Sequence, residues 1–75
     1  MQSKPDLEAR LLEAHAVGDL VKIASSYALA ADQAEEKENF DRACFFLTHA
    51  WIFALEAGDA AADKYRKRLA EYGRA

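Results

Sequence analysis

The residues that could bind a metal ion are few and scattered along this chain. The candidates are His15, His49, Cys44 and the carboxylates. Cys44 and His49 are five residues apart, which places them about 140° apart around a helix, so they cannot chelate one ion together. Neither histidine has a glutamate three residues before it, so the Glu-x-x-His pair of di-iron bundles is missing. We therefore expect no metal site and no cofactor.

The side chains that could act as nucleophiles also lack partners in the sequence. No histidine or acid stands at a spacing that would activate them, and so small a chain has little room for a cleft that excludes water. The three glycines are isolated, so there is no glycine-rich phosphate loop. We expect no catalytic residue and no enzymatic activity. The nucleophiles considered are Ser25, Ser26, Thr48 and Cys44.

The stretch from Phe40 to Ala57 predicts a helix that is apolar around most of its circumference. At about 100° per residue, its polar side chains occupy an arc of only about 120°. Such a helix must be packed on several sides, so we expect it at the centre of an all-helical domain. Its packing face is predicted to contain Phe40, Ala43, Leu47, Ala50 and Ala54, flanked by Cys44, Trp51, Phe46 and Phe53.

Turn signals divide the rest of the chain into further helices. A short first helix is predicted from Ser3 to about Ala16, a second from Leu20 to about Lys37, and a last one from about Ala60 to Tyr72. The breaks between helices are predicted at Gly18-Asp19, Glu38-Asn39 and Gly58-Asp59, with Asp19 and Asn39 as N-terminal caps, and Gly73 ends the last helix. Breaks about 20 residues apart indicate antiparallel neighbours. The sequence thus predicts one domain over residues 1–75, a small antiparallel bundle of four helices with a short first one.

The packing faces of the second and last helices follow from helical spacing. Alanines dominate the later turns of the second helix, which lets the central helix approach closely. The predicted face of the second helix is Leu20, Ile23, Ala24, Tyr27, Ala31 and Ala34, and that of the last helix is Ala62, Tyr65, Leu69 and Tyr72.

Bulk composition argues against several classes of function. A net charge of −3 gives no general attraction for nucleic acid or anionic lipid. No stretch has the 18 or so apolar residues of a membrane span, and the N-terminus does not resemble a secretory signal. The single cysteine, Cys44, cannot form an internal disulfide and is predicted to be a buried thiol. We expect a cytoplasmic protein.

Two families share parts of this pattern. The segment from Glu38 to Ala43, with Leu47 and Ala50, resembles the helical hairpin of tetratricopeptide repeats. The first-helix signature of that family is matched upstream, but about two helical turns too far away, at Leu20, Ile23, Ala24 and Tyr27. Ala24, Ala31, Asn39, Phe40, Ala43 and Ala50 are also similar to the pattern of the microtubule-interacting and transport domain, a three-helix relative. Both resemblances imply a module that binds a peptide or a partner helix and does no chemistry.

The polar arc of the central helix contains large apolar side chains. Phe45 and Ile52 project into it beside His49, with Leu55 at its edge. Either the first helix covers these residues, or they are exposed and bind a partner helix or a second copy of the chain, because adjacent exposed apolar groups usually mark an interface. The sequence therefore predicts a protein-interaction module that acts through this helix, by binding a partner helix or by forming a homo-oligomer.

Charge is distributed unevenly, which suggests an alternative function. Residues 32–41 are mostly acidic, whereas the last helix carries Lys64, Arg66, Lys67 and Arg68. One interpretation is that the two groups face each other at one end of the bundle, where basic residues also favour a helix C-terminus. The other is that the basic helix of a small regulatory protein binds an acidic partner or nucleic acid, against which the net charge argues.

Overall fold

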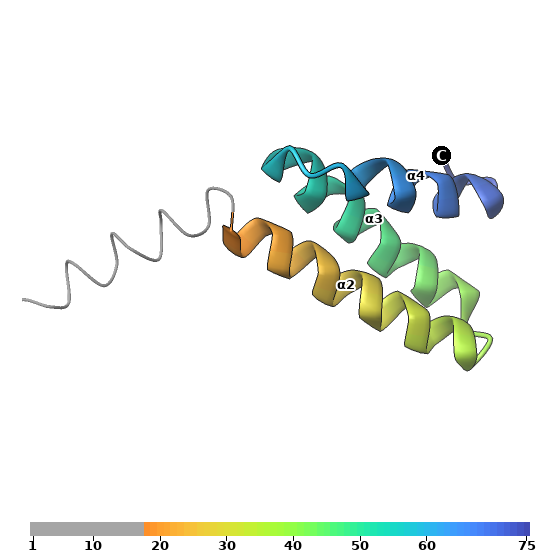
Figure 1. Ribbon diagram of the computed structural model, residues 1–75. Helices are drawn as coiled ribbons and strands as arrows, with labels where there is room; N and C mark the ends of the chain where they lie inside the picture. The colour runs from red at the N-terminus through yellow and green to blue at the C-terminus, as the bar shows by residue number, and fades with distance from the viewer. Residues whose placement is uncertain (1–17) are drawn as a thin grey trace, which may run out of the picture.

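The computed structural model describes residues 18–75, and within this part all regular structure is helical. The helices are α2 (Gly18–Glu36), α3 (Phe40–Ala57) and α4 (Ala61–Glu71) (Figure 1). This confirms the all-α class and places the last three predicted helices within a few residues of their expected bounds. The predicted first helix, from Ser3 to about Ala16, lies outside the described residues, so the bundle of four helices stays a prediction.

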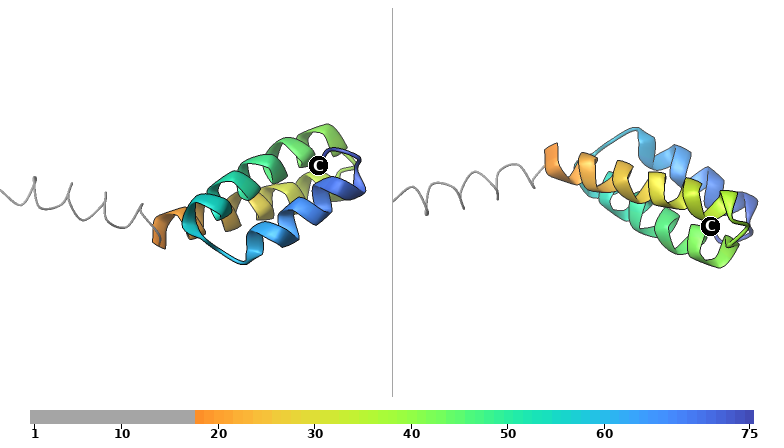
Figure 2. Two further views of the ribbon diagram at one scale, coloured as in Figure 1. Left: turned by 90° about the horizontal axis from the view of Figure 1, so that it is seen from above. Right: turned by 90° about the horizontal axis from the view of Figure 1, so that it is seen from below.

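α3 is the central helix of the described part, as predicted. It packs against both α2 and α4, and the views of Figure 2 show the three helices lying alongside one another. The end of α4 returns to the start of α3. The ring centroids of Phe40 and Tyr72 are 5.9 Å apart, and Arg74 Nη2 lies 2.7 Å from Asp41 Oδ1. The end of α2, the start of α3 and the end of α4 therefore share one pole of the bundle.

Small side chains form most of the core between α2 and α3. Ala24 and Ala31 on α2, and Ala43, Ala50 and Ala54 on α3, have no exposed surface. With no side chain beyond Cβ, these residues let the two helix backbones approach closely. The largest fully buried side chains are leucines, Leu47 on α3 and Leu69 on α4. Cys44 is buried, as expected, and so are Ala62 and Tyr65 on the predicted face of α4.

Two expectations about the ends of helices are wrong. Phe40 was expected on the packing face, but it is 47% exposed because it is the first residue of α3 and reaches only the end of α4, at Tyr72. Asp19 was expected to cap the second helix from outside it, yet Gly18 and Asp19 both lie within α2. The predicted break before them involves residues outside the described part.

The other predicted caps are confirmed. Asn39 Oδ1 accepts a hydrogen bond from the backbone N–H of Arg42 at 3.3 Å, which caps the start of α3. Gly58 and Gly73 adopt left-handed conformations, with φ of 68° and 75°. Asp59 also acts at the start of α4, where its Oδ1 accepts from the backbone N–H of Ala61 at 3.0 Å.

All three helices end in the same hydrogen-bonded turn, the Schellman motif. At the end of α2 the N–H of Asn39 donates to the carbonyl of Ala34 at 2.8 Å, and that of Glu38 donates to Glu35 at 2.9 Å. In the other two turns, the N–H of Asp59 donates to the carbonyl of Ala54, and the N–H of Arg74 donates to the carbonyl of Leu69. The left-handed residue is glycine in two of these turns, but at the end of α2 it is Glu38, with φ of 59°.

The alanine core predicts sensitivity to added volume. Ala50→Leu should lower the free energy of unfolding by about 1–3 kcal/mol, because the extra atoms must separate α3 from α2. Ala70→Leu is the matched control, since Ala70 is exposed on α4 and leucine is nearly as good a helix former as alanine. Urea unfolding followed by circular dichroism measures both, and an Ala50→Leu protein as stable as the control would contradict the packing described here.

The turn after α2 predicts a stabilising substitution. Glu38→Gly should raise the free energy of unfolding by about 1 kcal/mol, because glycine adopts positive φ without the steric cost that Cβ imposes. Glu38→Gln removes the same charge but keeps Cβ, so it should leave stability nearly unchanged. Thermal unfolding of the two variants separates backbone strain from charge, and equal melting temperatures would refute the strain.

Candidate interaction surface

Three large apolar side chains lie exposed along one side of α3. Phe45 and Leu55 are each 56% exposed and Ile52 is 45% exposed. Phe45 and Ile52 are seven residues apart, which places them about two turns apart on nearly the same side of the helix. We call Phe45, Ile52 and Leu55 the α3 outer strip.

The outer strip is exposed because α2 and α4 cover other sides of α3. Tyr27 on α2 contacts one flank of α3, with its ring 6.1 Å from that of Phe46 and stacked 5.8 Å from that of Phe53. The opposite flank carries the buried Cys44 and the half-buried Trp51, and α4 packs on α3 as well. The outer strip lies on the side between these flanks, away from the alanine core.

The polar residues beside the outer strip direct their donors back into α3. The Thr48 hydroxyl donates to the carbonyl of Cys44 at 2.8 Å. His49 Nδ1 lies 2.9 Å from the carbonyl oxygen of Phe45. Since a carbonyl oxygen only accepts, Nδ1 carries the proton, and in the neutral ring Nε2 keeps a free lone pair. This side of α3 therefore offers a partner fewer polar donors than its sequence suggests.

His49 joins the outer strip to α2 through ring contacts. Its ring lies 4.5 Å from that of Phe45 and 5.1 Å from that of Tyr27, both within the range of favourable aromatic pairs. Phe45 also meets Phe46 edge to face at 5.5 Å. Of the four predicted residues of α3, Phe45 and His49 are therefore in contact, and Ile52 and Leu55 lie further along the same helix.

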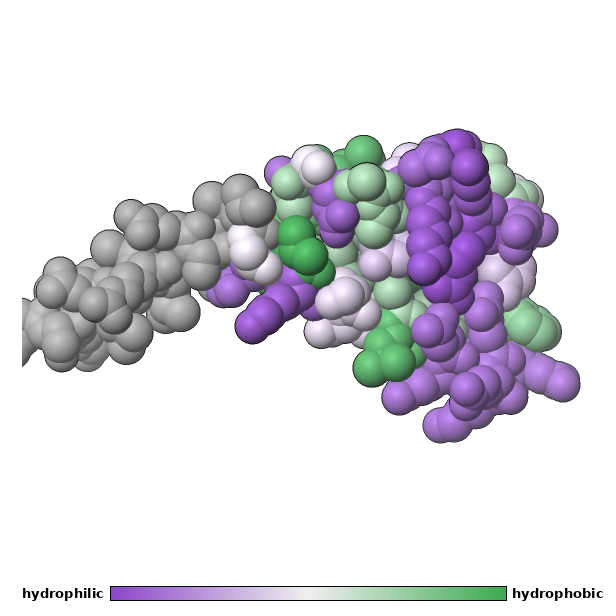
Figure 3. Space-filling view, in the orientation of Figure 1, coloured by the Kyte–Doolittle hydropathy of each residue, from purple (hydrophilic) through white to green (hydrophobic). Residues whose placement is uncertain are grey.

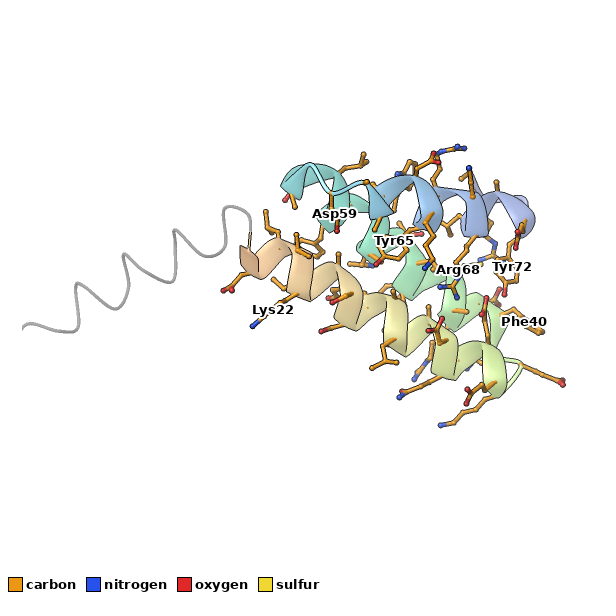
Figure 4. All side chains as sticks on the ribbon, viewed as in Figure 1. Lys22, Phe40, Asp59, Tyr65, Arg68 and Tyr72 are labelled. Carbon is orange, nitrogen blue, oxygen red and sulfur yellow. The ribbon has the colours of Figure 1, made fainter. Side chains whose placement is uncertain are left out.

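The basic residues of α4 do not form one free cluster. Arg68 reaches across to α2, where its Nη2 lies 2.8 Å from Asp32 Oδ1 and 2.9 Å from Glu35 Oε1. Figure 4 shows Arg68 pointing from α4 towards α2, and Figure 3 shows hydrophilic residues gathered over the later turns of both helices. These ion pairs agree with the interpretation that the acidic and basic groups face each other.

The remaining basic residues of α4 are closer to solvent. Arg66 and Lys67 pair with Asp63 within α4, at 3.0 and 3.2 Å, and hold the pKa of that carboxyl below its ordinary value. Lys64 is exposed, and within residues 18–75 no ion pair reaches it. Binding of an acidic partner or nucleic acid by this helix stays a prediction.

Glu35 holds α4 to α2 through a second contact. The Tyr72 hydroxyl donates a hydrogen bond to Glu35, which raises the pKa of Tyr72 to about 12. Partial burial opposes the charge of Arg68, but Asp32 and Glu35 together raise the pKa of its guanidinium above the ordinary value. Both groups therefore keep the protonated form in which they donate to α2.

Sequence analysis missed some residues that matter for this surface. Ala28 was not placed on a packing face, although it is buried in the core and follows Ala24 by one helical turn. The spacing of Ala24, Ala28 and Ala31 was the available signal. No signal in the sequence predicted the ring contacts of Tyr27, since these depend on how α2 is rotated against α3.

Two further kinds of feature, a metal site and a membrane-spanning helix, are not found within the described residues. Among residues 18–75, no three histidine, cysteine or carboxylate side chains are grouped so that they could hold a metal ion. No helix within this part combines the length and hydropathy needed to cross a membrane.

Comparisons with known proteins found no matching family model, no matching curated protein and no matching solved structure.

The ion pairs of Arg68 predict unequal effects of two similar substitutions. Arg68→Ala should lower the free energy of unfolding by about 1–2 kcal/mol, because it removes two ion pairs and the packing of a mostly covered side chain. Arg66→Ala removes one exposed pair within α4 and should cost less than about 0.5 kcal/mol. Urea unfolding at low and high salt tests this, and equal losses would show that the contact of Arg68 with α2 contributes nothing.

Proposed function

We propose that this protein is a non-enzymatic interaction module that binds a partner helix, or a second copy of itself, through the α3 outer strip. The observation that supports this most is the joint exposure of Phe45, Ile52 and Leu55 on one side of a helix. Adjacent exposed groups of this size usually mark an interface. Phe45 and Ile52 are already about half covered, so burying the rest of them would contribute roughly 2–3 kcal/mol before the cost of association.

The surroundings of the outer strip fit helix binding better than chemistry. The donors of Thr48 and His49 are already hydrogen-bonded within α3, so an apolar partner that covers them leaves few polar groups without a hydrogen bond. The rings of His49 and Phe45 support each other, which reduces the side-chain entropy lost on binding. An apolar stripe on one helix is the usual counterpart of an amphipathic helix.

Charge near the outer strip bears on the choice of partner. Asp41 lies near the start of α3 and Glu56 near its end. Antiparallel pairing of two copies along α3 would bring Asp41 of one copy near Glu56 of the other, and like charges oppose such contact. A partner helix with basic residues beside its apolar face avoids this repulsion.

The outer strip can be tested by a double substitution. Phe45→Ser with Ile52→Asp should abolish a dimer or partner complex and leave helicity largely intact, because both side chains lie outside the core. Light scattering over a range of protein concentrations measures self-association, and circular dichroism reports the fold. Leu29→Asp is the control, since Leu29 is 59% exposed on α2 and outside the outer strip. Unfolding of the double variant alone would show that Phe45 and Ile52 belong to the core.

A further inference from the structure

A second surface lies between α2 and α3. A hollow of about 290 Å³ is lined by Ile23, Ser26, Tyr27, Ala30 and Phe46. Another of about 220 Å³ continues towards the turn after α2 and shares Ala30 and Phe46 with the first. Because they share these two residues, the two hollows adjoin, and we call them together the α2–α3 groove.

The two ends of the α2–α3 groove differ in chemistry. The end near the start of α2 is walled by Ile23, Tyr27 and Phe46, and the ring contacts of Tyr27 with Phe46 and Phe53 hold its side chain in place. The end near the turn is polar, and Lys37 and Arg42 line it together with Gln33 and Asn39. A ligand that fills the groove must therefore be apolar in one part and polar in the other.

Lys37 and Arg42 take part in no ion pair within residues 18–75. Three of the five acids at the same pole are paired with other basic residues. Asp32 and Glu35 bind Arg68, and Asp41 binds Arg74. Glu36 and Glu38 lie close in sequence but do not line the groove. Two basic groups thus converge on one end of an apolar groove, which is complementary to a carboxylate.

We propose that the α2–α3 groove binds an amphipathic helix of a partner protein, with its apolar side chains against Tyr27 and Phe46 and an acidic side chain between Lys37 and Arg42. The proposal goes beyond the proposed function, because this groove is separate from the α3 outer strip. Lys37 is ten residues from Tyr27 on α2, or about 15 Å along the helix, and Arg42 is four residues from Phe46 on α3, or about 6 Å. An acid between the two charges should therefore stand about 10 Å, or two helical turns, from the apolar pair in the ligand.

The experiment is a selection from a display library of random 16-residue peptides on the immobilised full chain, followed by fluorescence anisotropy of the enriched peptides. Enriched sequences should carry an apolar pair at helical spacing and an aspartate or glutamate about two turns away. Lys37→Glu with Arg42→Glu should weaken binding about tenfold, because attraction becomes repulsion. A peptide with lysine in place of the acid should bind this double variant better than it binds the parent protein.

Controls separate the groove from folding and from the outer strip. Lys64→Glu reverses one basic charge on α4, outside the groove, and should leave binding unchanged. If the double reversal unfolds the protein, Lys37→Gln with Arg42→Gln, which only removes the two charges, is measured in its place. No enrichment, or enriched peptides without the acid, would overturn the proposal. So would peptides that bind the Lys37 and Arg42 variants normally but lose binding with Phe45→Ser and Ile52→Asp, a result that would leave the proposed function standing. Self-association of the chain that the charge reversal abolishes would identify a second copy as the occupant and would also overturn it.

Discussion

Close contact between α2 and α3 through alanine is the constraint on which the rest of the structure depends. Fully buried alanines line both helices, at Ala24 and Ala31 and at Ala43, Ala50 and Ala54. Each contributes little apolar area, so the contact gains its stability from many short-range dispersion contacts between closely spaced backbones. Such an interface tolerates little change in volume, because no flexible side chain is available to adjust.

An alanine core leaves the large apolar side chains at its margins. The aromatic residues Tyr27, Phe46 and Phe53 are half-buried around it, and Phe45, Ile52 and Leu55 remain outside. The same choice of residues therefore explains both the thin core and the two candidate binding surfaces. α4 is attached differently, through Leu69 and Tyr65 in the core and through the polar contacts of Arg68 and Tyr72 with α2.

Local signals in the sequence predicted much of the fold. Asn39, Gly58 and Gly73 mark the ends of helices because their side chains or backbone freedom act within a few residues, and helical spacing identified the buried alanines. Asp19 is not the cap that was predicted, since an aspartate near a helix start can also lie within the first turn. Phe40 was misplaced because helical spacing ignores where the neighbouring helix ends. The ion pairs of Arg68, more than 30 residues distant in sequence, and the α2–α3 groove depend on the rotation of whole helices, which no local pattern encodes.

The short turns between helices bear on how the chain reaches this structure. α3 packs on the helix that precedes it and on the helix that follows it, so most tertiary contacts join residues close in sequence. The chain then has only small loops to close, and topologies of this kind fold in microseconds to milliseconds. A domain that forms this quickly exposes its core residues only briefly, so the apolar residues that stay on the folded surface account for most of its risk of aggregation.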